Sequence, residues 1–82
     1  MPRYFFNVYD GVVRLDNTGD ELPDVMSARR EAIRIAGSLL EDAGSRNELG
    51  EEWRLEVVDA SGLLLFRLDF SVTASSAVSA DA

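Results

Sequence analysis

The acidic residues near the N-terminus are the side chains of this sequence with the most evident chemical potential. Five carboxylates lie close together in the chain, at Asp10, Asp16, Asp20, Glu21 and Asp24. Clustered carboxylates can hold Ca²⁺ or Mg²⁺. Segment 16–21 departs from a calcium-binding loop, however, because its third position is Thr18 and Gly19 comes two residues early. We therefore assign these acids to a turn, a helix cap and the solvated surface, and predict no metal site.

Arg29 is the second chemical candidate, because it falls inside the apolar arc of a predicted helix. Its guanidinium can reach the sheet edge or pair with an acid such as Asp16 or Glu21. A structural ion pair is the interpretation we favour. The alternative is a small-ligand or anion site that uses the planar guanidinium of Arg29 together with the loop 16–24.

The composition excludes several classes of chemistry. The chain has no cysteine, histidine or lysine, and its eight basic residues are all arginine. Disulfides, thiol nucleophiles, histidine bases and lysine Schiff bases are therefore ruled out. A pair of carboxylates could still catalyse hydrolysis, but nothing positions two of them around a pocket, and a chain of 82 residues has little room for an enclosed cleft. We predict no enzymatic activity and no cofactor.

The net charge of -7 argues against binding to nucleic acids or anionic membranes. No apolar run is long enough to span a bilayer. A cytoplasmic protein is the default expectation.

The N-terminal part of the chain predicts a β-hairpin. Strands over 3–9 and 12–16 flank Asp10-Gly11, a strong signal for a two-residue turn. This turn would place Tyr9 opposite Val12 and Val8 opposite Val13. The predicted core face then carries Tyr4, Phe6, Val8, Val13 and Leu15.

A helix is predicted over about 25–43, with Asp24 as its N-cap and Gly44 as its stop. One broad arc of this helix is apolar and rich in alanine, which indicates close packing on a sheet. The arc is formed by Val25, Met26, Ala28, Ala32, Ile33, Ile35, Ala36, Leu39, Leu40 and Ala43.

The C-terminal part predicts a second hairpin, with strands over 53–59 and 63–70 around Ala60-Ser61-Gly62, preceded by a polar loop over 45–52. The register that we favour pairs Trp53 with Phe70, Leu55 with Leu68 and Val57 with Phe66. It also pairs Glu56 with Arg67 and Arg54 with Asp69 as two cross-strand salt bridges. Residues 71–82 are predicted to form a flexible low-complexity tail.

A combination of short motifs resembles a family of small bacterial proteins of unknown function. These motifs are the opening Pro-Arg-Tyr-Phe-Phe of residues 2–6, Asp10-Gly11, Ala-Arg-x-Glu-Ala over 28–32, Trp-Arg-x-Glu-Val over 53–57, and Gly62. The resemblance covers about residues 2–70. It implies a fold and carries over no catalytic residue.

The sequence therefore predicts one α+β domain over 1–70, with the order β-β-α-β-β. We expect a four-stranded antiparallel sheet with one helix packed on one face. The two hairpins should meet through strand 3–9, paired with either strand of the second hairpin.

The sheet face without a helix is the predicted interaction surface, because it is too apolar for a simple solvated face. Its interface residues would be Phe5, Tyr9, Val58, Leu63, Leu65 and Arg67. The function we predict is a small non-catalytic protein-interaction module, in which the sheet face or an edge strand binds a protein. We expect the protein to act as an isologous homodimer, the commonest form of such assembly.

Overall fold

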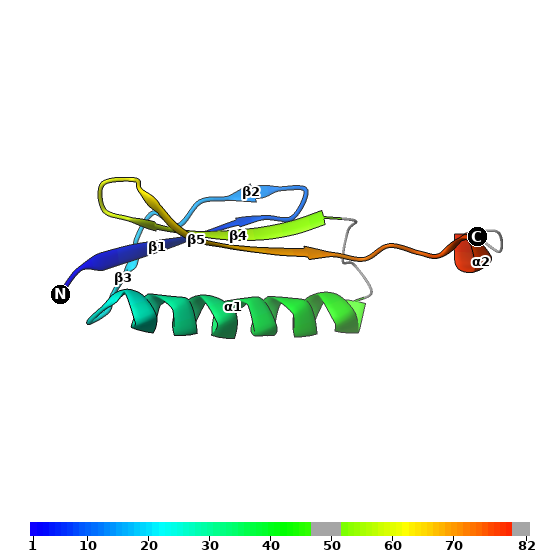
Figure 1. Cartoon of the computed structure of the whole chain (residues 1–82), viewed down its shortest axis with the longest axis horizontal. Helices are drawn as coiled ribbons and strands as arrows, with labels where there is room; N and C mark the ends of the chain where they lie inside the picture. The colour runs from blue at the N-terminus through cyan, green and yellow to red at the C-terminus, as the bar shows by residue number, and fades with distance from the viewer. Residues whose placement is uncertain (47–51, 80–82) are drawn as a thin grey trace.

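The structure is a computed structural model that describes residues 1–46 and 52–79. One antiparallel sheet lies on one long helix, as Figure 1 shows. The elements in chain order are β1 (Arg3–Tyr9), β2 (Val13–Arg14), β3 (Asp20–Glu21), α1 (Val25–Arg46), β4 (Glu52–Asp59), β5 (Leu64–Ser71) and α2 (Ser76–Ser79). The predicted α+β fold is confirmed, and the short strand β3 is an addition to it.

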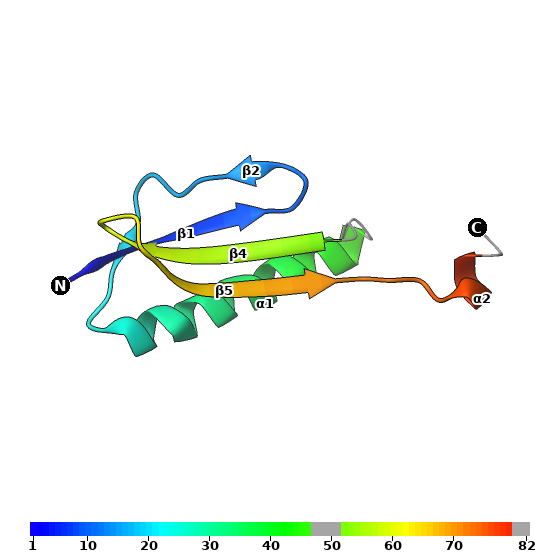
Figure 2. The same ribbon diagram turned by 45° about the horizontal axis from the view of Figure 1, so that its top comes forward.

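The sheet order is β2-β1-β4-β5, with β3 paired to β1 (Figure 2). The two hairpins meet where β1 pairs antiparallel with β4, from Tyr4 opposite Asp59 to Tyr9 opposite Arg54. Of the two arrangements left open by the sequence, strand 3–9 thus pairs with 53–59. This choice leaves β5 at the edge of the sheet.

The predicted register of the N-terminal hairpin is wrong by one residue, since Tyr9 pairs with Val13 and Val8 with Arg14. The loop has three residues: Asp10 N–H donates to the Val12 carbonyl (3.3 Å), and Gly11 has a φ of 92°. Val13 is therefore 62% exposed, although it was predicted in the core. Leu15 is likewise exposed.

Three rows of side chains, from β1, β4 and α1, form the core between the sheet and the helix. Tyr4, Phe6 and Val8 of β1 lie beside Trp53, Leu55 and Val57 of β4, over Ala28, Ala32 and Ala36 of α1. The three alanines are almost completely buried, so α1 approaches the sheet closely, as the sequence predicts.

The N-terminal end of α1 follows the prediction and its C-terminal end does not. Ser27 N–H donates to Asp24 Oδ1 (2.7 Å), which confirms Asp24 as the cap. Gly44 does not stop the helix, which continues to Arg46. A terminating glycine takes a positive φ, and among the described residues only Gly11, Gly19 and Gly62 do so. Most of the predicted loop 45–52 lies outside the described residues.

The register of the C-terminal hairpin is confirmed at all five predicted pairs. The predicted cross-strand salt bridges are wrong, however. The ion pairs run along each strand, from Arg54 to Glu56 (3.1 Å) and from Arg67 to Asp69 (2.9 Å). A β-bulge next to Val58 pairs that residue with Leu64.

The predicted tail begins inside the last strand, because Ser71 belongs to β5. The chain then leaves the sheet and forms the short helix α2, which lies apart from the sheet and α1 in Figures 1 and 2.

Candidate functional site

Strand β5 forms a free edge of the sheet. Seven of its eight residues pair with β4 on one side, the exception being Leu65 at the bulge, and no other strand of the described residues pairs with it (Figure 2). An edge strand turns the backbone N–H and C=O groups of every second residue outward, where they can pair with another chain. Charged residues often protect such edges, but Arg67 and Asp69 neutralise each other here. β5 is therefore a template for a further strand.

Apolar side chains border this edge on the helix side. Phe66, Leu68 and Phe70 are only partly buried, whereas the side chains opposite them on β4 are buried almost completely. This difference in burial follows from the position of β5 in the sheet, because a side chain on an edge strand has a neighbouring strand on one side only.

One flank of α1 adds to this border. Met26 and Ile33 lie seven residues apart, about two turns, so they share one side of the helix, and they are 59% and 49% exposed. Glu31 lies on the other flank, where it pairs with Arg34. In Figure 2, α1 runs from left to right behind the sheet, with its buried alanine stripe toward the sheet. The right-handed turn of the helix therefore directs the flank with Met26 and Ile33 toward β5, and the flank with Glu31 toward β1. We call β5, with Phe66, Leu68, Phe70, Met26 and Ile33, the β5 edge surface.

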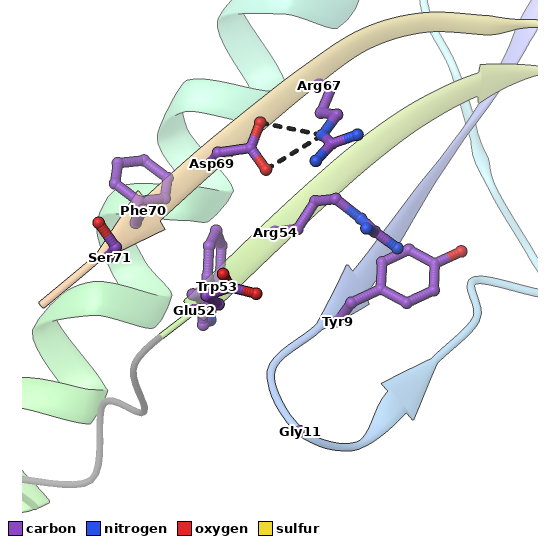
Figure 3. A pocket seen from close by; sticks show the side chains of 9 residues that line it. All are labelled: Tyr9, Gly11, Glu52, Trp53, Arg54, Arg67, Asp69, Phe70 and Ser71. Atoms are coloured by element: carbon purple, nitrogen blue, oxygen red, sulfur yellow. Dashed lines mark hydrogen bonds and ion pairs between the residues drawn. The ribbon is translucent and has the colours of Figure 1, made fainter.

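The opposite face of the sheet contains an open depression of about 540 Å³ (Figure 3). It is lined by Tyr9, Gly11, Glu52, Trp53, Arg54, Arg67, Asp69, Phe70 and Ser71. Trp53 and Phe70 border it although their side chains turn toward α1 and the core. The Arg54 guanidinium lies over the Tyr9 ring, 4.3 Å from its centroid, a cation–π contact. Arg54 Nε is 3.1 Å from Glu56 Oε2 but is not aligned for a hydrogen bond, so this contact is electrostatic. Both arginines of the depression are thus engaged by acids of their own strands.

The structure places the six predicted interface residues in different surroundings. Phe5, Tyr9 and Val58 are half-buried on the face without the helix. Phe5 lies under the segment before β3, because its ring is in close contact with Gly19. Leu63 is exposed in the β4–β5 turn and Arg67 on β5. Leu65 was expected on this face but packs against the core instead, since the bulge shifts it out of the regular alternation.

The residues of the predicted anion site do not come together. Arg29 is exposed on α1 rather than enclosed by the sheet. Glu21 pairs with Arg3, whose Nη2 is 3.0 Å from Glu21 Oε1. The Asp16 carboxylate accepts hydrogen bonds from backbone N–H groups. The predicted ion pair of Arg29 with Asp16 or Glu21 is therefore wrong, because both acids have nearer partners on β1 and its loop.

Asp16 organises the segment that covers Phe5. Its carboxylate accepts hydrogen bonds from the backbone N–H groups of Phe6 (3.2 Å), Thr18 (3.1 Å) and Gly19 (2.9 Å). Burial alone would raise the pKa of Asp16. The hydrogen bonds from Gly19, Phe6 and Thr18, and then the charge of Arg3, outweigh burial and hold the pKa below its ordinary value. Asp16 is a structural acid, and no group of three or more potential metal ligands occurs within residues 1–46 and 52–79.

Replacing Asp16 with asparagine is expected to lower the free energy of unfolding by about 1–3 kcal/mol at pH 7, because one amide oxygen cannot serve three N–H donors. The folded-state pKa of Asp16 is lowered, so its contribution is present above the unfolded pKa of about 4 and is lost as the pH falls through the folded pKa. The difference between the wild type and Asp16→Asn should therefore begin to shrink as the pH falls below about 4. Urea denaturation from pH 7 to pH 3 measures this, and a constant difference would contradict the role of the charge.

These features define a small α+β domain with a one-sided helical cover, an open opposite face and a free edge strand. Residues 3–71 match the domain of unknown function DUF6894, so the chain belongs to that family. Comparisons with curated proteins and with solved structures found no match. Neither α1 nor α2 combines the length and hydrophobicity needed to cross a membrane.

The β5 edge surface was only partly visible in the sequence. The alternation Phe66-Arg67-Leu68-Asp69-Phe70 indicates a strand, but its position at the sheet edge depends on the strand order. The helical periodicity places Met26 and Ile33 in the buried arc of the helix. They are exposed because the closely packed alanines define a buried stripe narrower than that arc.

Proposed function

We propose that this protein is a small non-catalytic interaction module that acts as a homodimer, and that its contact surface is the β5 edge surface. The supporting observation is an eight-residue edge strand, charge-neutral over Arg67 and Asp69, bordered by half-exposed Phe66, Leu68 and Phe70. An exposed strand of this kind joins readily to another strand, because the pairing satisfies its outward backbone groups and buries its apolar border.

The face without the helix is a weaker candidate for the contact. Phe5 is shielded by the segment at Gly19, and Arg54 is engaged by Tyr9 and Glu56. Desolvating these charges would cost free energy, whereas the border of β5 is apolar.

The non-catalytic part of the proposal is supported by the structural use of the acids. Asp16 binds three backbone N–H groups, Asp24 caps α1, and Asp59 accepts hydrogen bonds from Ser61 and Leu63 in the β4–β5 turn. Acids committed to such contacts are poor candidates for proton transfer to a substrate.

Size-exclusion chromatography with light scattering tests the proposal. The wild type is expected at twice the chain mass of 9.0 kDa at micromolar concentration. Leu68→Lys places an inward-pointing charge on the edge strand, a device that blocks edge-to-edge pairing, and should give a monomer. Circular dichroism verifies that this variant remains folded.

Val13→Lys is the matched control, because Val13 is an exposed apolar residue opposite Tyr9, at the other edge of the sheet. This variant should stay dimeric. A monomeric wild type would refute the homodimer. A dimer that survives Leu68→Lys and dissociates with Val13→Lys would move the contact to the other edge.

A further inference from the structure

We propose that two copies of the chain pair through antiparallel β5 strands, related by a two-fold axis that passes beside Leu68 perpendicular to the sheet. The inference rests on the proposed homodimer and specifies its register. It is carried by the order of charged and apolar residues along β5. When a second β5 runs in the opposite direction with Leu68 opposite Leu68, opposite charges face each other and apolar residues face each other.

Symmetry restricts the possible registers. In an antiparallel pair formed by a two-fold axis perpendicular to the sheet, opposite residues lie on the same face, so the axis must pass beside a residue and not between two. Near the middle of β5 this leaves Arg67, Leu68 and Asp69 as centres.

Charge selects among these three centres. An axis at Arg67 places Arg67 opposite its own copy, and an axis at Asp69 does the same for Asp69, so like charges would meet. An axis at Leu68 places Arg67 opposite Asp69 of the second copy, and the reverse pair forms by symmetry. Each arginine already contacts the aspartate of its own strand at 2.9 Å (Figure 3). Four charges of alternating sign would therefore surround the axis.

The helix side of β5 is complementary in the same register. Leu68 would meet Leu68 of the second copy, and Phe66 would meet Phe70 of the second copy on both sides of the axis. Phe66, Leu68 and Phe70 are the partly buried residues of the edge, so their remaining exposed surface would be covered. The overlap extends over residues 65–71, nearly the whole strand.

This arrangement determines the form of the assembly. The path β2-β1-β4-β5 of one copy would continue into the reverse path of the other as one sheet. Because the axis is perpendicular to the sheet, both α1 helices would lie on one face and both depressions on the other. In both copies, the flank of α1 that carries Met26 and Ile33 would face the two-fold axis.

Cysteine cross-linking tests the register, and the absence of cysteine from the chain removes any background. Directly opposite residues in an antiparallel pair have Cα atoms about 5.5 Å apart or less, within the range of a disulfide. In the proposed register, the Cα atoms of Arg67 in the two copies would be about 8 Å apart, which is beyond the Cα–Cα range of a disulfide. Arg67→Cys and Asp69→Cys are purified separately, verified as dimers by light scattering, and oxidised alone or after mixing.

The expected result is a disulfide-linked heterodimer in the mixture and no cross-link in either variant alone. A cross-link in Arg67→Cys alone would place the axis at Arg67, and one in Asp69→Cys alone would place it at Asp69. Either outcome overturns the proposed register. Dimers without any cross-link would also overturn it while leaving the homodimer intact, whereas a monomeric wild type would refute both.

A charge exchange gives an independent measurement on the cysteine-free chain. Arg67→Asp should weaken dimerisation about fivefold to thirtyfold, because two attractive cross-strand pairs become repulsive. The double variant Arg67→Asp/Asp69→Arg restores opposite charges and should return the dissociation constant to within about twofold of the wild type. Arg14→Asp, at the far edge, is the matched control and should leave the dissociation constant unchanged. Equal weakening by the single and double variants would contradict the register.

Discussion

Replacing Trp53 with alanine is expected to remove about 3–5 kcal/mol of folding free energy. Trp53 is 4% exposed and packs edge-on against Phe70, with ring centroids 5.2 Å apart. The truncation would leave a cavity between β4, β5 and α1 and would remove the main support of Phe70. A domain of this size has about 4–12 kcal/mol of total stability, so the truncation should remove a large fraction of it.

Urea denaturation followed by circular dichroism measures this effect without the tryptophan signal. Trp53→Phe is the control, because it retains an aromatic ring beside Phe70 and should cost clearly less than the alanine variant. A loss of less than about 1 kcal/mol for Trp53→Ala would contradict a close-packed core at this end of the sheet. The effect should also reach the dimer, since Phe70 belongs to the β5 edge surface.

Gly19→Ala is expected to lower the free energy of unfolding by about 2–4 kcal/mol. Gly19 has a φ of 73°, a region that L-residues rarely adopt. A Cβ atom at this position would also lie 2.9 Å from each of three atoms: the Arg3 side chain, the Phe5 ring and the Tyr4 carbonyl oxygen. The carbonyl belongs to β1 and cannot move without disturbing the sheet, so the overlap adds to the backbone strain.

Two further glycines separate these causes. Gly62→Ala has a similar φ of 87° but open space around the new methyl group, so it should cost only about 1–2 kcal/mol. Gly37→Ala lies in α1 with nothing near the new methyl group, and should stabilise the protein by about 0.5–1 kcal/mol. Thermal unfolding of the three variants measures the series. Equal losses for Gly19→Ala and Gly62→Ala would show that the close approach to β1 contributes nothing.

The two substitutions probe opposite sides of the sheet. Trp53 supports the edge through which we propose the chain to assemble, and Gly19 allows the loop held by Asp16 to cover Phe5. If the dimer forms at β5, Gly19→Ala should affect folding without changing the dissociation constant of the folded protein. An equal effect on both would indicate that the loop at Gly19 takes part in the contact.

The sequence alone predicted the features that depend on interactions between residues close in the chain or on the pattern along one element. Asp24 caps the helix because its carboxylate reaches the N–H of a residue three positions later. The C-terminal hairpin has its predicted register because a slip by one residue would place charged side chains opposite Trp53 and Leu55. The alanine stripe of α1 predicted close packing because small side chains let a helix approach a sheet.

The N-terminal hairpin shows where local chemistry was insufficient. Asp10-Gly11 favours a two-residue turn, but the observed loop has three residues. The Asn7 side chain accepts a hydrogen bond from Asp16 N–H (2.9 Å), and Asp16 in turn binds Phe6, Thr18 and Gly19. These contacts set the path of the chain after β2, and their combined free energy outweighs the preference of a single turn.

The sequence by itself determined the fold class, the helix start and the pairing of the last two strands, because each depends on residues close in the chain or on alternation along a strand. Only the tertiary structure decided that β5 is an edge and that Arg29 is exposed. Arg29 is exposed because the buried stripe of α1 is confined to residues such as Ala28, Ala32 and Ala36. The edge position of β5 depends on β1 pairing with β4, a contact between residues about fifty positions apart along the chain. The free energy of such a contact comes from side chains that meet only when the whole sheet forms on the helix. For the same reason, the self-complementary order of β5 acquires meaning only after the strand is placed at the edge.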